Sequence, residues 1–323
     1  MKYKLLSAYL LVMKFLAFGS GNGAGQRKKP FKNKTIMRPD GVEVSYRYRR
    51  PETNNPNIAF QGGWTTHPAV YLAQIRDLAS QYGVLTMENR GHWHSRLGNS
   101  TPNTYIDDLV EDFKAILDAE KIEKIVITGH SMWGAAAMHF YHKYPERVLG
   151  LVLVAPAYTD PRKLGFMKNY DFLHPISEKL ASLAGHATGF DFVKRHVLSR
   201  TPLAWHALRF VLLVTFLKEA KNQEDVEKMI KNVYRADIKA MSMSMQALFL
   251  MNGNLREKAR EIEVPVLIIG GKQDSLIHPE SLEELADYVP NAKLEIWNEV
   301  AHFPMLTYPA RFTHRVVQFL EDI

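Results

Sequence analysis

The feature that most constrains the fold is a regular alternation of short apolar runs with helical patterns, which begins near residue 35. The runs have the length and the β-branched residues of strands: Val42–Tyr48, Ile58–Gln61, Gly83–Met87, Ile125–Thr128, Leu149–Ala155, Val264–Ile269 and Lys293–Trp297. Patterns of helical period lie between them, as at Ala69–Gln81, Tyr105–Glu120 and Pro279–Tyr288. Strands that alternate with helices predict an α/β fold, in which helices cover both faces of a mostly parallel sheet.

The alternation stops between about residues 158 and 250, where the pattern is mainly helical. An insertion between two strands of such a sheet is expected to cover its carboxyl edge, where open α/β sheets bind ligands. The sequence therefore predicts a core formed by residues 35–157 and 251–323, with a helical cap at residues 158–250.

The positive charge of the chain is concentrated at its beginning. The net charge is +7, but eight of the 41 Lys and Arg residues lie in residues 1–34, which leaves 33 cations against 34 Asp and Glu residues. A nucleic-acid-binding domain carries its basic surface on the folded part. We therefore expect no nucleic-acid partner.

Residues 1–34 form a separate basic and apolar segment. A charged start precedes the apolar run Leu5–Phe18, and small residues and the basic stretch Arg27–Lys34 follow it. The segment fits a signal peptide. It also fits an anchor that lies on a membrane surface, with cations near anionic headgroups. A disordered tail on a cytoplasmic protein is the third interpretation, and we favour export or membrane association over it.

Several kinds of site have no support in the sequence. The chain contains no cysteine, so disulfides, thiolate metal sites and a cysteine nucleophile are excluded. The histidines lack the spacing of an H-E-x-x-H zinc motif, and no G-x-x-x-x-G-K-[ST] phosphate loop is present. We expect neither a metal ion nor another cofactor.

A serine stands at a predicted turn between a buried strand and a helix. The strand Ile125–Thr128 leads through Gly129 and Ser131 into a helical pattern that is rich in alanine. A serine on such a turn stands clear of the sheet, and the next backbone N–H can stabilise an oxyanion. The small residue expected two positions after the serine is replaced by Trp133.

These residues resemble a known family. Gly-His-Ser-Met-Trp-Gly at residues 129–134 resembles the Gly-His-Ser-Met-Gly-Gly turn of α/β-hydrolase fold esterases and lipases. Arg-Gly-His-Trp-His-Ser at residues 90–95 is similar to the family's Arg-Gly-His-Gly-x-Ser stretch, again with tryptophan in place of a glycine. Gly-Gly-Trp at residues 62–64 stands where the family has its oxyanion loop. The resemblance covers residues 35–157 and 251–323 and leaves the cap unmatched.

The resemblance implies a catalytic triad in the order serine, acid, histidine. Gly-Lys-Gln-Asp at residues 271–274 and Ala-His-Phe-Pro at residues 301–304 are similar to the family's acid and histidine turns, which indicates Asp274 and His302. In this chemistry a neutral imidazole takes the proton of the serine hydroxyl and later gives it to the leaving group. A buried carboxylate fixes the tautomer of that imidazole.

The same resemblance suggests the surroundings of the triad. The oxyanion donors are expected to be the backbone N–H of Met132 and that of Trp64, or of Gly63 in the alternative register Gln-Gly-Gly at residues 61–63. Trp133 and Phe303 are expected to line the substrate pocket. A tryptophan at position 133 also threatens to crowd the turn and to displace the N–H of Met132.

We therefore expect a serine hydrolase that cleaves a small-molecule carboxylic ester with a hydrophobic acyl group through an acyl-enzyme. The same scaffold permits thioesters, lactones, carbon–carbon bond cleavage or perhydrolysis. A non-catalytic ligand-binding relative with a perturbed serine turn is the alternative from a different class.

Overall fold

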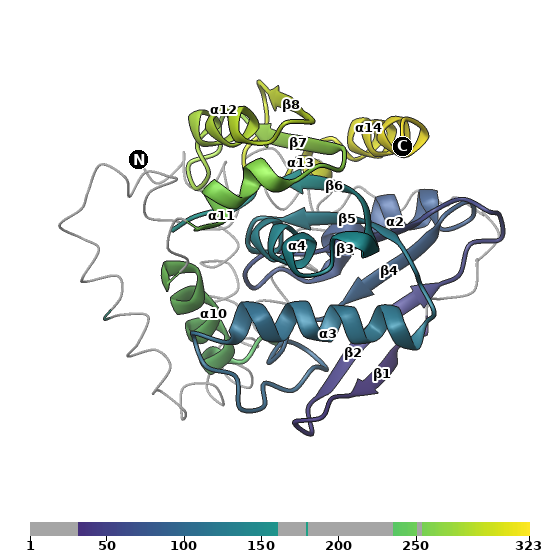
Figure 1. The fold of residues 1–323 in the computed structure, drawn as a ribbon, viewed down its shortest axis with the longest axis vertical. Coiled ribbons are helices and arrows are strands. Elements are labelled where there is room, and N and C mark those ends of the chain that lie inside the picture. Colours follow the sequence, from purple (N-terminus) through teal and green to yellow (C-terminus); the bar gives the residue numbers. More distant parts are fainter. Residues whose placement is uncertain (1–31, 161–178, 180–234, 251–253) are drawn as a thin grey trace, which may run out of the picture. The chain divides into compact units, whose positions relative to one another are not determined.

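The computed structural model describes residues 32–160, 179, 235–250 and 254–323. These residues form an eight-stranded sheet in the order β1-β2-β4-β3-β5-β6-β7-β8 (Figure 1). The strands are β1 (Lys34–Met37), β2 (Glu43–Arg49), β3 (Asn57–Gln61), β4 (Gly83–Met87), β5 (Ile125–His130), β6 (Val148–Val154), β7 (Val266–Gly271) and β8 (Ala292–Trp297).

The sheet is mostly parallel, as the sequence predicts. β2 pairs antiparallel with both β1 and β4, and the neighbours from β4 to β8 pair in parallel. All six residues of β5 are buried, as expected for a central parallel strand covered on both faces. The parallel strands end at one edge of the sheet, so the loops after β3, β4, β5, β7 and β8 meet there.

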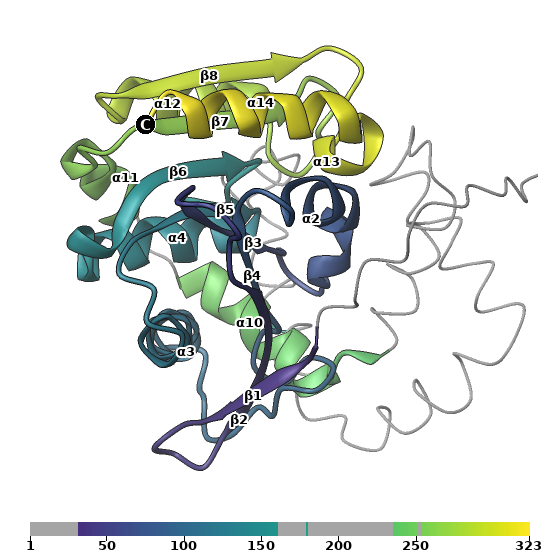
Figure 2. The same ribbon diagram turned by 90° about the vertical axis from the view of Figure 1, so that its right-hand side faces the viewer.

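Helices cover both faces of the sheet. α3 and α4 lie on one side of strands β3 to β5 and α2 lies on the other, where it packs against α14 (Figure 2). The described helices are η1 (Pro68–Tyr71), α2 (Leu72–Leu78), α3 (Tyr105–Ala119), α4 (Met132–Lys143), η2 (Pro145–Arg147), α10 (Ile238–Leu250), α11 (Asn254–Lys258), η6 (Ala259–Glu261), α12 (Pro279–Tyr288), α13 (Pro304–Thr307) and α14 (Pro309–Glu321).

Some boundaries differ from the sequence prediction. β7 begins at Val266 rather than at Val264, because Pro265 has no N–H to donate to a neighbouring strand. β1 is absent from the prediction, since its four residues lie at the edge of the sheet and none is buried. Its pairing with β2 is a long-range contact that the local pattern does not reveal.

Helix α10 is the part of the predicted cap that the structure describes in most detail. Its approach to the carboxyl edge is close: a Cβ added to Gly91, in the loop after β4, would lie 2.2 Å from the Cβ of Ala240. The N–H of Asp237, just before α10, donates to the carbonyl of Gly91 at 3.0 Å. Most of residues 158–250 lies outside the described residues, so the extent of the cap stays a prediction.

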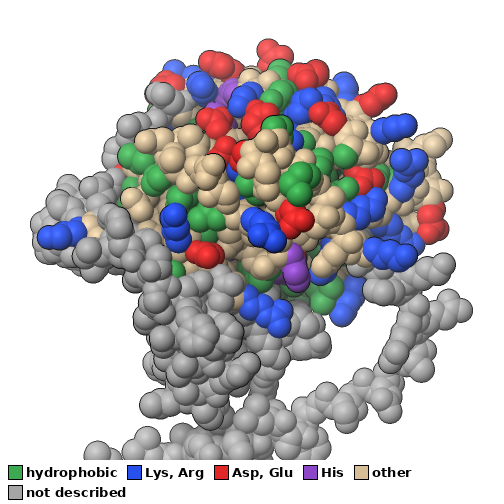
Figure 3. All heavy atoms as spheres, turned by 90° about the horizontal axis from the view of Figure 1, so that it is seen from below, with side chains coloured by type: hydrophobic (Ala, Val, Ile, Leu, Met, Phe, Trp, Pro, Cys, Tyr) green, Lys and Arg blue, Asp and Glu red, His purple; other side chains and the backbone are tan. Residues whose placement is uncertain are grey.

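The basic N-terminal segment also falls almost wholly outside the described residues, and its predicted role stays a prediction. Within the part of the chain that the structure describes, no helix is long and apolar enough to cross a membrane. On the face shown in Figure 3, basic and acidic side chains are interspersed. This mixture agrees with the near balance of charges in the sequence after residue 34.

Candidate active site

Ser131 occupies a strained turn between β5 and α4. Its φ is 53° and its ψ is −114°, in a region that residues other than glycine rarely adopt. The backbone is fixed from two sides: the N–H of Ser131 donates to the carbonyl of Val154 in β6, and its carbonyl accepts from the N–H groups of Gly134 and Ala157, each at 2.9 Å. The residue is only partly buried. The turn therefore presents the serine at the carboxyl edge of the sheet, as the sequence predicts.

The close approaches at this turn fall on two glycines. A Cβ added to Gly129 would lie 2.3 Å from the carbonyl oxygen of Trp133, and one added to Gly134 would lie 2.4 Å from the Cβ of Pro156. Larger side chains at either position would displace the backbone. The atom of residue 133 that lies close to Gly129 is its backbone carbonyl oxygen, so this contact does not involve the indole.

Trp133 is part of the hydrophobic core. Its side chain is fully buried, its ring packs edge-on against Phe113 of α3 with 5.5 Å between centroids, and its Nε1–H donates to Asn89 Oδ1 at 2.6 Å. This corrects the expectation that Trp133 lines the substrate pocket. The indole is directed into the space between α3 and α4, where it is enclosed by protein.

Asp274 and His302 meet directly. They follow β7 and β8, and His302 Nδ1 lies 2.7 Å from Asp274 Oδ2. Both residues are buried. The other carboxylate oxygen of Asp274 accepts the backbone N–H groups of Leu276 at 2.8 Å and Ile277 at 3.0 Å. The carboxylate is therefore held in one orientation and can hold the imidazole in one orientation in turn.

Gly271 allows the two loops to meet. A Cβ at this position would lie 2.1 Å from the carbonyl oxygen of Val300 and 2.3 Å from that of Ala301. The chain just before His302 thus passes directly against the end of β7. The N–H of Gln273 also donates to the carbonyl of Val300 at 2.9 Å. A larger residue at position 271 would require one of the two loops to shift.

His130, the residue before Ser131, is bonded to the histidine of the candidate triad. His130 Nε2 donates to the backbone carbonyl of His302 at 2.9 Å, and the two rings lie with centroids 4.6 Å apart. Within the described residues no hydrogen bond joins the hydroxyl of Ser131 to His302. Catalytic hydrogen bonds in ligand-free enzymes are often long and shorten only when substrate is bound.

The environment of His130 keeps its ring neutral. Complete burial, with a further contribution from nearby His302, lowers the pKa of His130 well below its ordinary value. Since Nε2 carries the proton that is donated to His302, Nδ1 is left as an acceptor, and no hydrogen-bond donor among the described residues reaches it. The sequence indicates no role for His130, because its hydrogen bond to the carbonyl of His302 depends on the fold.

The loop after β3 lies against the serine. A Cβ at Gly63 would lie 2.7 Å from the Cβ of Ser131 and 3.2 Å from His130 Nδ1. The side chain of Trp64 extends to α10, where its Nε1–H donates to the carbonyl of Met241 at 2.9 Å. The observed contact favours the register in which Gly63 supplies the second oxyanion donor, which stays a prediction, as does the N–H of Met132 at the start of α4.

Phe303 lies beside the candidate triad. Its ring centroid is 4.7 Å from that of His130 and 5.3 Å from that of His302. Its place in a substrate pocket stays a prediction. No group of three or more His, Cys, Asp or Glu side chains in the described part of the chain is arranged to hold a metal ion.

The strand order and the placement of serine, acid and histidine after separate parallel strands define the class of α/β hydrolases. The sequence pattern of the alpha/beta hydrolase fold matches residues 56–309, which is more than half of the chain. The protein belongs to this family.

Curated relatives and solved structures agree with this assignment. The chain is 26% identical to a 3-oxoadipate enol-lactonase of Acinetobacter baylyi, over 89% of this chain and 97% of that protein. It is 24% identical to a pimeloyl-[acyl-carrier protein] methyl ester esterase of Nitrosospira multiformis, over 82% and 94%. The crystal structure of a Rhodococcus esterase is similar in fold, with a TM-score of 0.70, 19% identity and coverage of 90% and 98%. These relatives are hydrolases of the same family.

Proposed function

We propose that this protein is a serine hydrolase that cleaves carboxylic esters through an acyl-enzyme. Ser131 is the nucleophile, His302 the general base and acid, and Asp274 the acid that orients His302. The observation that carries the proposal is the buried 2.7 Å contact between His302 Nδ1 and Asp274 Oδ2, at the sheet edge where Ser131 occupies its strained turn.

The reaction divides into two acyl transfers. Ser131 Oγ attacks the ester carbonyl carbon while its proton moves to His302 Nε2, and Asp274 stabilises the imidazolium that forms. Collapse of the tetrahedral intermediate breaks the bond to the alcohol oxygen, which takes the proton from His302. A water molecule then attacks the acyl-enzyme in the same way, with His302 as base, and releases the acid and free Ser131.

The oxyanion that forms in each step needs N–H donors at the serine. We assign this role to the backbone N–H of Met132, at the start of α4, and to that of Gly63, whose backbone lies against Ser131. The first N–H groups of an α-helix have no partner within the helix and are therefore available. Losing one such donor typically lowers the rate about 100- to 1000-fold.

The proposed substrates are esters of small hydrophobic acids. The related lactonase and methyl ester esterase are named for lactone and methyl ester substrates, and both bonds are carboxylic esters. In this chain the aromatic ring of Phe303 borders the candidate triad, and the predicted cap contains the strongly apolar stretch Leu203–Leu217.

A panel of p-nitrophenyl esters with acyl chains from acetate to laurate tests the proposal. We expect hydrolysis of at least part of the panel, with kcat/KM rising along the chain length to an optimum. The matched control is Ser131→Ala, which should reduce the rate at least about 1000-fold and leave the thermal unfolding temperature near that of the wild type. Equal hydrolysis by wild type and Ser131→Ala would refute the assignment of the nucleophile.

A further inference from the structure

We propose that Glu88, His67 and His94 form a clamp that positions the oxyanion loop, residues 62–67, against Ser131. The three are positioning residues, since they act on the reaction through the loop backbone. The inference rests on the proposed function.

Glu88 receives hydrogen bonds from two separate loops. It follows β4 directly and is buried. Its Oε1 lies 3.4 Å from His67 Nε2, in the loop after β3. Its Oε2 accepts the backbone N–H of His94 at 2.9 Å and lies 3.0 Å from His94 Nδ1. One carboxylate thus joins the oxyanion loop to the loop after β4.

The tautomer of His67 follows from its second contact. His67 Nδ1 accepts the backbone N–H of Ala69 at 2.9 Å and so caps the helix η1. An accepting Nδ1 leaves the ring proton on Nε2, which is the nitrogen that faces Glu88. The single imidazole therefore fixes the end of the oxyanion loop at two points.

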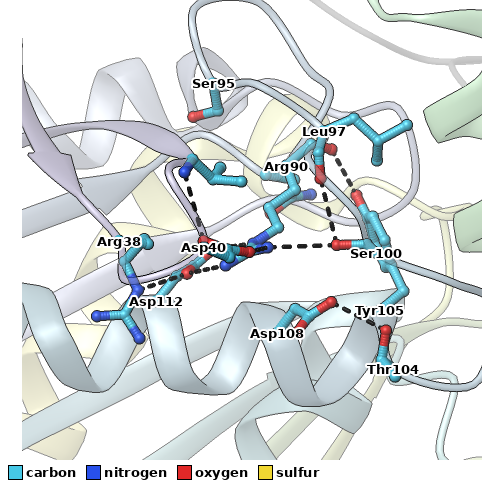
Figure 4. Close-up of polar contacts among 12 residues, drawn as sticks. Arg38, Asp40, Arg90, Ser95, Leu97, Ser100, Thr104, Tyr105, Asp108 and Asp112 are labelled. Atoms are coloured by element: carbon cyan, nitrogen blue, oxygen red, sulfur yellow. Dashed lines mark hydrogen bonds and ion pairs between the residues drawn. The ribbon is translucent and has the colours of Figure 1, made fainter.

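The loop after β4 is itself held in place by hydrogen bonds. Arg90 donates to both carboxylate oxygens of Asp112, at 2.7 and 2.8 Å, and to Asp40 at 2.6 Å (Figure 4). Ser95 donates to the carbonyl of Glu88 at 2.8 Å and accepts the N–H of Ser45 in β2 at 2.9 Å. Since Arg90 and the carboxylate of Asp112 are buried, this segment is anchored to α3 and to the sheet.

The charge of Glu88 suits the role. Burial by itself raises the pKa of Glu88, but the hydrogen bonds from His67 and from the backbone of His94 outweigh it and hold the pKa below its usual value. The carboxylate is therefore ionised at neutral pH, and hydrogen bonds to a charged acceptor are stronger than those between neutral groups.

Trp93, in the loop after β4, packs against the ring of His67. It has a φ of 51°, a left-handed conformation that costs a bulky residue about 1–2 kcal/mol. Its ring packs edge-on against that of His67, with centroids 4.6 Å apart. The family's glycine at this position would take the conformation without strain but would leave the imidazole uncovered. Backbone strain of this kind is concentrated at functional sites.

The clamp affects the reaction because the oxyanion loop passes directly against Ser131. Gly63 stands four residues before His67, and a Cβ at Gly63 would lie 2.7 Å from the Cβ of Ser131. A shift of about 1 Å in a positioned group can lower a rate about 100-fold. We therefore expect loss of the bond between His67 and Glu88 to lower kcat about 10- to 100-fold with a small change in KM.

Two variants of His67 separate the clamp from the helix cap. His67→Asn keeps an acceptor for the N–H of Ala69, since asparagine is a good cap residue, but it is too short to reach Glu88. His67→Gln places an amide N–H near the former Nε2 and loses the cap. We expect kcat for the best p-nitrophenyl ester to fall about 10-fold or more in His67→Asn and to stay closer to wild type in His67→Gln.

Amide hydrogen exchange of residues 62–67 gives a readout that does not need catalysis. We expect faster exchange in His67→Asn than in His67→Gln or the wild type. Equal exchange in all three proteins, or equal kcat in the two variants, would overturn the clamp. If the wild type hydrolyses none of the esters, the proposed function is refuted, and the clamp is then tested by the amide hydrogen exchange alone. Glu88→Gln replaces His67→Asn if the latter does not fold.

Discussion

Replacing Asp274 with asparagine tests how the buried carboxylate acts on His302. In the wild type, Oδ1 accepts two backbone N–H groups at 2.8 and 3.0 Å, and Oδ2 lies 2.7 Å from His302 Nδ1. The asparagine amide is expected to place its oxygen at the two N–H donors and its NH2 group toward Nδ1. That arrangement requires Nδ1 to accept, which puts the ring proton on Nε2. His302 can then no longer take the proton of Ser131.

The structure sets the size of the effect. Turning the amide around to restore the working tautomer would leave the N–H groups of Leu276 and Ile277 without an acceptor, at about 1–3 kcal/mol for each. The working state therefore becomes less favourable by about 2–6 kcal/mol, and its population falls about 30-fold to about 3 × 10⁴-fold at 1.36 kcal/mol for each tenfold. The same substitution in a Ser-His-Asp triad lowers kcat about 10⁴-fold.

The assay is the steady-state hydrolysis of a p-nitrophenyl ester at neutral pH, with thermal unfolding as the check of the fold. Asp287→Asn is the matched control, because Asp287 is exposed on α12 and loses the same charge. We expect a fall in kcat of at least 30-fold, on the order of the effect derived above, only in Asp274→Asn. A variant that is stably folded and keeps more than about a tenth of the wild-type kcat would refute the tautomer argument.

Three further changes test other parts of the account. Gly63→Ala should lower kcat about 100-fold, because its Cβ would lie 2.7 Å from the Cβ of Ser131; wild-type kcat in this variant would contradict the close approach. Trp133→Ala should lower the free energy of unfolding by about 3–5 kcal/mol, measured in urea, whereas a change below about 1 kcal/mol would show that the indole is not packed as described. His130 has a folded-state pKa below its ordinary value, so the unfolded chain binds the extra proton and stability falls as the pH drops below about 6.5, by up to 1.4 kcal/mol for each pH unit. Urea unfolding at about pH 7.5 and about pH 5.5, on either side of the ordinary histidine pKa, measures this loss of stability. The loss should be smaller in His130→Gln than in the wild type, and an equal loss in both proteins would argue against a neutral buried imidazole.

The sheet and the pairing of Asp274 with His302 could be predicted from the sequence alone. The strand Gly83–Met87 and the helix Pro279–Tyr288 have the predicted bounds, because turn residues or a proline delimit each. The contact between Asp274 and His302 was predictable for a topological reason. Residues that follow neighbouring parallel strands meet at the same edge of the sheet.

The remaining features depend on long-range packing. The sequence could not show that α4 approaches Pro156 at Gly134, and so it could not show that Trp133 is free to enter the core. The register of the oxyanion loop was open for the same reason, since only the fold brings Gly63 against Ser131.

The clamp of Glu88, His67 and His94 could not be predicted from the sequence either. No sequence motif links Glu88 to His67, which lies 21 residues earlier in the chain. Its two histidine partners come from different loops, and their approach depends on the packing of β3 beside β4.

The most direct test of the central claim is covalent labelling of the intact protein with a fluorophosphonate, followed by mass spectrometry of its peptides. A serine activated by His302 and Asp274 should give a single adduct on Ser131, which is absent from Ser131→Ala and forms more slowly in Asp274→Asn. Equal labelling of wild type and Ser131→Ala, or a folded wild-type protein that takes up no label, would contradict the account.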